Sequence, residues 1–122
     1  MASRIEKLNS TLRELQVDVS DIEAGALVSE DGLLLASALP PNIDQDNIGG
    51  VVALLIQLSH RAVTELDQGG MERVIIQSEN GYSIVTKTTE NASLVVLARK
   101  GSTLGLLLMK IDSTANKISK IL

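Results

Sequence analysis

With 122 residues, of which 44% are hydrophobic, the chain is long enough to form one domain around a single core. Its formal net charge of −4 and its lack of any basic run argue against nucleic acid as a partner, because neutralising phosphates requires clustered lysine and arginine. The chain contains no cysteine, which excludes disulfides, thiolate metal sites and cysteine nucleophiles.

The first predicted element is an amphipathic helix over residues 4–16. Ser3 and Glu6 have the spacing of a capping box, in which a serine at the N-cap and a glutamate three residues later satisfy free backbone N–H groups. The apolar residues that follow at helical spacing are Ile5, Leu8, Leu12 and Leu15.

A β-hairpin is predicted next, with strands over residues 22–28 and 33–38. The turn between them is Ser29-Glu30-Asp31-Gly32, and Asp-Gly between two apolar runs is a strong hairpin signal because both residues tolerate a positive φ. Pro40-Pro41 ends the second strand, since proline has no N–H to donate to a strand ladder.

The middle of the chain predicts a second helix. Asp44 or Asp46 can cap its first turn, and the helix extends to about Asp67, before Gly69-Gly70 ends it. Three strands are expected after it, over residues 71–78, 82–88 and 93–99, with turns at Asn80-Gly81 and at residues 89–92. The last element is a helix over residues 104–122, and one face of it carries Leu104, Leu107, Leu108, Ile111, Ala115, Ile118 and Leu122.

Two of the predicted strands are apolar on both faces. Val74-Ile75-Ile76 and Leu94-Val95-Val96-Leu97 do not alternate, whereas a sheet with one face in water would. Both faces must therefore be covered by helices. We expect a single α/β (α+β) domain over residues 1–122, a three-layer sandwich in the order α-β-β-α-β-β-β-α with a five-stranded, largely antiparallel sheet.

The second helix is apolar around too much of its circumference for one packing partner. Its hydrophobic residues fill an arc of roughly 200°, whereas one partner needs about 100°. A loop or the first helix could cover the excess. The more specific interpretation is a two-fold homodimer interface. In it, the strand over residues 71–78, which would otherwise be an unpaired and aggregation-prone edge, continues the sheet into the second copy. The residues expected at this interface are Val51, Leu54, Leu55, Leu58, Ala62, Val74, Ile75 and Ile76.

The stretch Ala24-Gly25-Ala26-Leu27-Val28-Ser29-Glu30-Asp31-Gly32-Leu33 resembles the opening hairpin of the roadblock family, which includes dynein light chains and MglB-like bacterial polarity proteins. The later strand pair, Leu94-Val95-Val96-Leu97 and Gly105 are also similar to that family, and the resemblance covers nearly the whole chain. It implies a dimer formed by the second helix and third strand, and a scaffold or regulator of a Ras-like small GTPase. It further implies that MglB-like members stimulate GTP hydrolysis by rearranging the switch regions, without an arginine finger of their own.

No group of residues has the spacing of a catalytic site or a cofactor site. His60 is the only histidine, and Ser29, Ser37 and Ser59 have no base nearby in the sequence. Glu30-Asp31 is a pair of carboxylates in a tight turn, which it is expected to shape in contact with water. We therefore expect a protein that is not an enzyme and that holds no cofactor or metal.

The polar side of the second helix carries the residues expected to contact a GTPase, namely Gln57, Arg61 and Thr64. Arg61 could supply charge to a transition state, but a surface ion pair with Glu65 or a contact with Gln57, one turn away, is the favoured interpretation. The alternative function is a structural adaptor in a larger motor or signalling assembly, without nucleotide-dependent binding.

Two features bear on location and further contacts. The charged first turns and the short apolar cluster at residues 104–109 predict a cytoplasmic protein without membrane insertion. Leu106 and Met109 lie off the main stripe of the last helix, where they could pack under the chain ends or form a second docking patch.

Overall fold

Three helices and five strands follow one another in the predicted order. The structure is a computed structural model that describes residues 2–122. The elements are α1 (Arg4–Asp18), β1 (Ile22–Ser29), β2 (Leu34–Ala38), α2 (Gln45–Glu65), β3 (Arg73–Ser78), β4 (Gly81–Thr89), β5 (Ala92–Arg99) and α3 (Leu104–Ile121). None of the helices within residues 2–122 combines the length and the apolar character that a membrane span requires.

The five strands form one sheet in the order β2-β1-β5-β4-β3, and every neighbouring pair is antiparallel. The two hairpins predicted from Asp31-Gly32 and Asn80-Gly81 join β1 to β2 and β3 to β4. β5 lies between the hairpins and pairs with both, so the edges of the sheet are β2 and β3.

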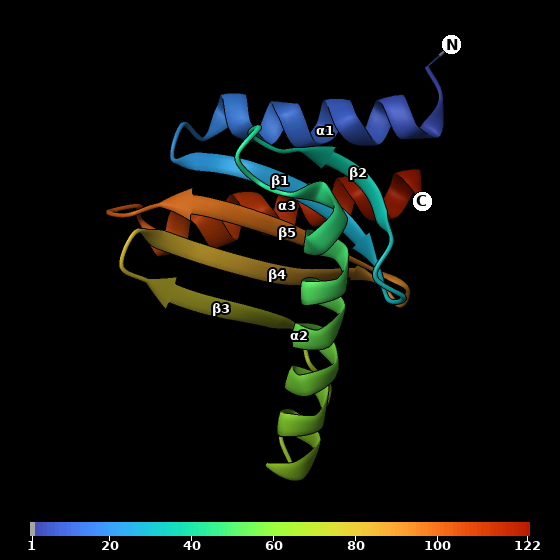
Figure 1. The fold of residues 1–122 in the computed structure, drawn as a ribbon, viewed down its shortest axis with the longest axis vertical. Coiled ribbons are helices and arrows are strands. Elements are labelled where there is room, and N and C mark those ends of the chain that lie inside the picture. Colours follow the sequence, from blue (N-terminus) through green and yellow to red (C-terminus); the bar gives the residue numbers. More distant parts are fainter. Residues whose placement is uncertain (1) are drawn as a thin grey trace.

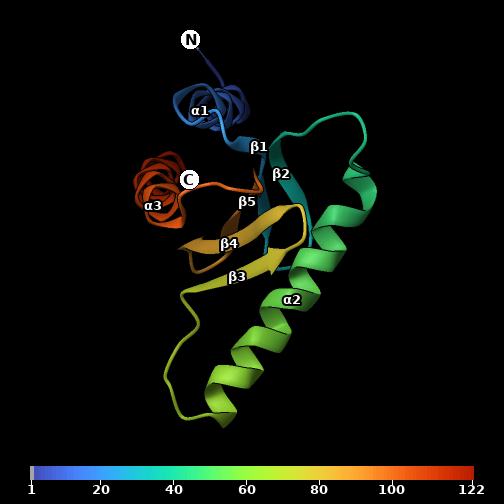
Figure 2. The same ribbon diagram turned by 90° about the vertical axis from the view of Figure 1, so that its left-hand side faces the viewer.

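Helices cover both faces of the sheet, as the apolar strands required. α1 and α3 lie side by side on one face, and α2 crosses the other (Figures 1 and 2). The core between the sheet and the α1–α3 layer is built around Leu12, Leu27 and Ile111. A smaller core under α2 contains Val28, Val52, Val85 and Val95. The three-layer sandwich is therefore confirmed.

The helix caps follow the sequence signals. The Ser3 side chain accepts a hydrogen bond from the Glu6 N–H at 3.1 Å, as expected for the N-cap of α1. Of the two aspartates considered for α2, Asp44 is the N-cap, and its carboxylate accepts from the Asp46 N–H at 2.9 Å. Asp46 lies within the first turn of the helix, where a negative charge complements the helix dipole.

Some boundaries differ by a few residues from the prediction. α2 ends at Glu65 instead of continuing to Asp67, because Asp67 has a φ of 57° and has left the right-handed helical region. β3 begins at Arg73 instead of Met71, because the chain first has to return from the end of α2 to the sheet. α1 extends to Asp18, two residues beyond the predicted end.

Two glycines bring α2 close to the β1–β2 turn. Gly32 adopts a φ of 88°, which this turn requires and which side chains disfavour. Gly49, inside α2, faces that turn so closely that a Cβ added to it would overlap the carbonyl oxygen of Gly32. The first half of α2 buries Gly49, Val52 and Ala53 against the rest of the domain. The second half extends past the β3 edge of the sheet (Figures 1 and 2).

Two side chains of α1 bond the backbone of β2. The Ser37 N–H donates to Asn9 Oδ1 at 3.1 Å, and the side-chain amide of Gln16 donates to the Ala38 carbonyl at 3.4 Å. The Asn9 bond occupies a backbone group that would otherwise be open to another strand, whereas Gln16 also donates to the Glu23 carbonyl of β1 at 2.9 Å and so bridges β1 and β2. Within residues 2–122, β3 pairs with β4 alone, and no helix side chain bonds its outer edge.

Replacing Asn9 with alanine should therefore cost about 1 kcal/mol of unfolding free energy, because a half-buried N–H loses its acceptor. Urea denaturation of both proteins measures the difference. An unchanged midpoint would contradict a capping role for Asn9. Ser10→Ala, on the exposed side of the same helix, is the control.

Candidate partner-binding surface

The broad apolar arc of α2 divides into two sides. Ile48 and Ile56 are half-buried against the smaller core and Val52 is buried in it. On the outward side Val51, Leu54 and Leu58 are 63%, 68% and 67% exposed. We call these three residues the α2 stripe. No loop or helix of residues 2–122 covers the α2 stripe, although the sequence had left that possibility open.

The other predicted interface residues are distributed over different surroundings. Leu55 is half-buried and packs against the smaller core, whereas Ala62 is exposed on the half of α2 that extends past the sheet. In β3, Val74 is half-buried under α2 and Ile76 is 39% exposed on the same face. Ile75 pairs with Ile84 of the larger core and so faces the α1–α3 side, away from the rest. The structure therefore does not place the eight residues on a single surface.

An apolar groove joins the α2 stripe to the sheet. It measures about 400 Å³, and the predicted residues Val51, Leu55 and Ile76 line it. Ile43 from the loop before α2 and Leu97 from β5 complete it. Neither of these two residues is predictable from the sequence, because nothing in the local pattern indicates which part of a sheet a crossing helix leaves uncovered.

The polar residues predicted for a partner lie on the outer surface of α2. Gln57 and Arg61 line a shallow hollow of about 410 Å³ together with Leu54 and Leu58. The Arg61 Nε lies 3.1 Å from Glu65 Oε1 in an exposed i,i+4 ion pair, which is the favoured interpretation of Arg61. Thr64 does not line the hollow, and its hydroxyl donates to the His60 carbonyl at 2.8 Å.

The residues considered for catalysis are not assembled into a catalytic arrangement. His60 is exposed and borders a small pocket of about 150 Å³ together with Glu30 and Glu90. The Ser29 hydroxyl accepts from the Leu33 N–H at 3.0 Å and so holds the β1–β2 turn. Within residues 2–122, no cluster of three histidine, aspartate or glutamate side chains is arranged to hold a metal ion.

Leu106 and Met109, for which the sequence allowed either packing or docking, are 57% and 58% exposed near the start of α3. They do not pack under the chain ends within the described residues. They lie on the opposite layer from the α2 stripe (Figure 2).

The fold and this surface define a small α/β domain with an uncovered apolar helix. The chain belongs to the Roadblock/LC7 domain family, which it matches over residues 8–98. Members of this family are generally non-catalytic scaffolds and regulators, with small-GTPase-related or adaptor roles. An uncharacterised protein of Methanocaldococcus jannaschii is 30% identical over 97 residues, a stretch that covers 80% of this chain and 81% of the relative.

Solved structures share the fold at low sequence identity. MglB of Myxococcus xanthus superimposes with a TM-score of 0.90 at 20% identity, covering 99% of this chain and 91% of that one. An MglB described as having a tetrameric arrangement gives a TM-score of 0.89 at 18% identity with the same coverage. These likenesses show that the chain has the MglB fold.

Proposed function

We propose that the protein is a cytoplasmic homodimer that binds a Ras-like small GTPase through a surface built by its two α2 helices. The observation that carries the proposal is the α2 stripe, in which three large aliphatic side chains are each more than 60% exposed. Removing a leucine or valine side chain from water stabilises by about 1.5–3 kcal/mol, so the stripe favours association.

A second copy of the chain is the occupant that fits both open features at once. The α2 stripe offers an apolar helix face, and β3 offers an unpaired strand edge beside it. A two-fold axis at this place packs the α2 stripe against the same stripe of the second copy and pairs the two β3 edges. Two-fold dimers are the commonest symmetric assemblies of soluble proteins. At the other edge, β2, the Ser37 N–H is already bonded by Asn9 of α1, which makes that edge the less suitable of the two for such pairing.

The polar residues proposed for the GTPase border the α2 stripe, since Gln57 and Arg61 share a hollow with Leu54 and Leu58. Gln57, Arg61 and Thr64 are exposed there and are our proposed contacts to the GTPase. Membership of the Roadblock/LC7 family supports a partner of this class. Because Arg61 is paired with Glu65, we propose that any stimulation of GTP hydrolysis follows the MglB-like route, in which the GTPase uses its own residues after its switch regions are rearranged.

The test is binding of a Ras-like GTPase from the same genome, loaded either with GDP or with a non-hydrolysable GTP analogue. We expect binding to depend on the nucleotide and Arg61→Glu to weaken it about tenfold, as loss of one polar contact of roughly 1.4 kcal/mol would. Lys110→Glu, the same charge reversal on the exposed side of α3, is the matched control and should bind like the wild type.

Equal binding of both nucleotide states would favour the alternative, a structural adaptor. If the protein binds the GTPase in neither nucleotide state, the proposal of a GTPase partner is wrong. The dimer is then tested separately by sedimentation.

A further inference from the structure

The outward side of α3 carries a stripe of exposed residues that neither the sheet nor α1 covers. Successive residues of a helix turn by about 100°, so residues three, four and seven apart share one side. The buried residues Leu107, Ile111 and Ile118 face the other way, into the larger core. The exposed residues within one arc of roughly 100°, which we call the α3 stripe, are Leu106, Met109, Lys110, Ser113, Lys117 and Lys120.

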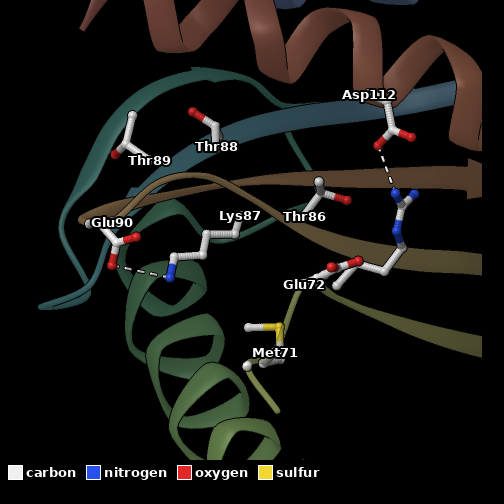
Figure 3. Close-up of a pocket in the computed structure, with 10 residues that line it drawn as sticks. Met71, Glu72, Thr86, Lys87, Thr88, Thr89, Glu90 and Asp112 are labelled. Carbon is white, nitrogen blue, oxygen red and sulfur yellow. Dashed lines mark hydrogen bonds and ion pairs between the residues drawn. The ribbon is translucent and has the colours of Figure 1, made fainter. Parts of the chain in front are cut away.

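The α3 stripe is basic in an otherwise acidic protein. The whole chain has a formal net charge of −4, but α3 contains three lysines, all in the stripe, and a single carboxylate, Asp112. Asp112 points toward the sheet, where its Oδ1 lies 2.7 Å from Arg73 Nη2 (Figure 3). Within residues 2–122, no ion pair involves Lys110, Lys117 or Lys120. The three positive charges of the stripe are therefore free to pair with carboxylates of another molecule.

Apolar and basic residues occupy different ends of the α3 stripe. Leu106 and Met109, which are more than half exposed, lie in the first two turns of α3, whereas Lys117 and Lys120 lie in the last two. The stripe from Leu106 to Lys120 is about 21 Å long, at 1.5 Å per residue. A complementary surface therefore has apolar groups at one end and negative charges at the other.

The surroundings of the α3 stripe disfavour two other occupants. A second α3 stripe has the same charge and would repel the first. An anionic bilayer would contact α1 together with α3, and α1 has no net charge to attract it. The charged residues of α1 are Arg4, Lys7 and Arg13 against Glu6, Glu14 and Asp18. The only aromatic residue, Tyr82, packs against the larger core, so this face has no tyrosine or tryptophan to anchor it in a bilayer interface.

We propose that the α3 stripe binds an amphipathic helix of a partner protein, with aliphatic residues at one end of its contact face and acidic residues at the other. Leu106 and Met109 pack against the aliphatic residues, and Lys117 and Lys120 pair with the carboxylates. A helix fits because side chains three and four residues apart on two helices interlock, whereas an extended segment gains main-chain hydrogen bonds only at a sheet edge. The proposal does not depend on the dimer or on a GTPase, which use the opposite layer (Figure 2).

The probe is a fluorescein-labelled helical peptide of about 20 residues, long enough to match the stripe and built on alanine and glutamine. One face carries two leucines near one end and three glutamates near the other. Two versions are used, with the leucines near the N-terminus or near the C-terminus, because the partner helix can run in either direction along α3. We expect one version to bind the whole protein saturably in fluorescence anisotropy. Changing its glutamates to glutamines should weaken binding at least tenfold, and added salt should weaken it too.

Lys117→Glu should weaken binding of that peptide at least tenfold, because it replaces an attraction with a repulsion. Leu106→Ser should weaken it about fivefold through loss of an apolar contact. Lys100→Glu is the matched control, since Lys100 is also exposed but lies in the turn before α3, outside the stripe. This variant should bind like the wild type.

Vesicles of equal parts phosphatidylserine and phosphatidylcholine are tested in parallel by co-sedimentation. Binding to these vesicles and to neither peptide would overturn the proposal, and so would no binding at all. Equal binding by the wild type and Lys117→Glu, or of the glutamate and glutamine peptides, would also overturn it. Lys117→Glu should leave binding of the GTPase unchanged, and Arg61→Glu should leave binding of the peptide unchanged, so the two partner sites are tested separately.

Discussion

Leu58→Asp is expected to convert the protein from a dimer to a folded monomer. Leu58 is 67% exposed in the protomer, so the substitution does not disturb the core. In the proposed dimer the same position lies against apolar side chains of the second copy, where an unpaired carboxylate costs several kcal/mol. A loss of about 4 kcal/mol corresponds to a roughly thousandfold weaker dimer, which sedimentation equilibrium at micromolar concentration measures.

Leu106→Asp is the matched control for this experiment. Leu106 is 57% exposed, so the chemical change and the starting exposure are similar, but it lies on α3, on the other layer of the molecule. We expect this variant to sediment as the wild type does. A Leu58→Asp variant that remained dimeric would place the interface elsewhere, and a monomeric wild type would remove the dimer from the proposal.

Gly49→Ala is expected to destabilise the fold by about 2–3 kcal/mol, in the range that overpacking costs. The added Cβ would overlap the Gly32 carbonyl oxygen, and both groups belong to backbone that cannot rotate away. Either the first half of α2 or the β1–β2 turn has to move. Thermal and urea unfolding followed by circular dichroism measure the loss.

Replacing the neighbouring glycine, Gly50, with alanine is expected to have the opposite effect on stability. Gly50 also lies within α2, but a Cβ added there meets no atom within 4 Å. Alanine is favoured over glycine inside a helix by roughly 0.8–1 kcal/mol, so Gly50→Ala should stabilise the protein. Two adjacent glycines then change stability in opposite directions. If both variants were stabilised, the close packing of α2 on the turn would be wrong.

Much of the fold was predictable because its local signals agree with one another. The Asp31-Gly32 and Asn80-Gly81 turns, the Ser3 cap and the non-alternating strands all predict the order of elements that the structure has. The ends of α2 and β3 were less predictable. They depend on the positive φ of Asp67 and on the path of the chain back to the sheet, and neither produces a periodic pattern of apolar residues in the sequence.

The candidate interface was predictable only in part. The excess apolar arc of α2 is visible in the sequence. Which of its residues are buried in the protomer and which are exposed is not visible: Leu55 packs inward, while the adjacent Leu54 is 68% exposed. An aspartate at Leu55 would therefore disturb the protomer as well as the interface, which makes Leu58 the clearer test. Strand alternation by itself places Ile75 on the opposite face from Ile76, as the register of β3 and β4 shows.

The polar cavity of about 510 Å³ between α3 and the ends of β3 and β4, which Arg73, Thr86 and Asp112 line, could not be predicted from the sequence. Arg73, Thr86 and Asp112 come from three different elements, and their proximity exists only after β3 pairs with β4 and α3 packs across them. A threonine in a strand is ordinary in any sequence. Only burial and the missing hydrogen-bond partners distinguish Thr86 and Thr88 from others.

In the proposed dimer, the difference between the two sheet edges would limit how far copies of the chain can add to one another. An unprotected strand at both ends would let copies add indefinitely, as in a fibre. In the proposed dimer the β3 edges pair with each other, and in β2 Asn9 already holds the Ser37 N–H, so each copy has fewer free edge groups with which to extend its sheet further. We therefore expect loss of the Asn9 side chain to increase aggregation through the β2 edge at protein concentrations where the wild type remains dispersed.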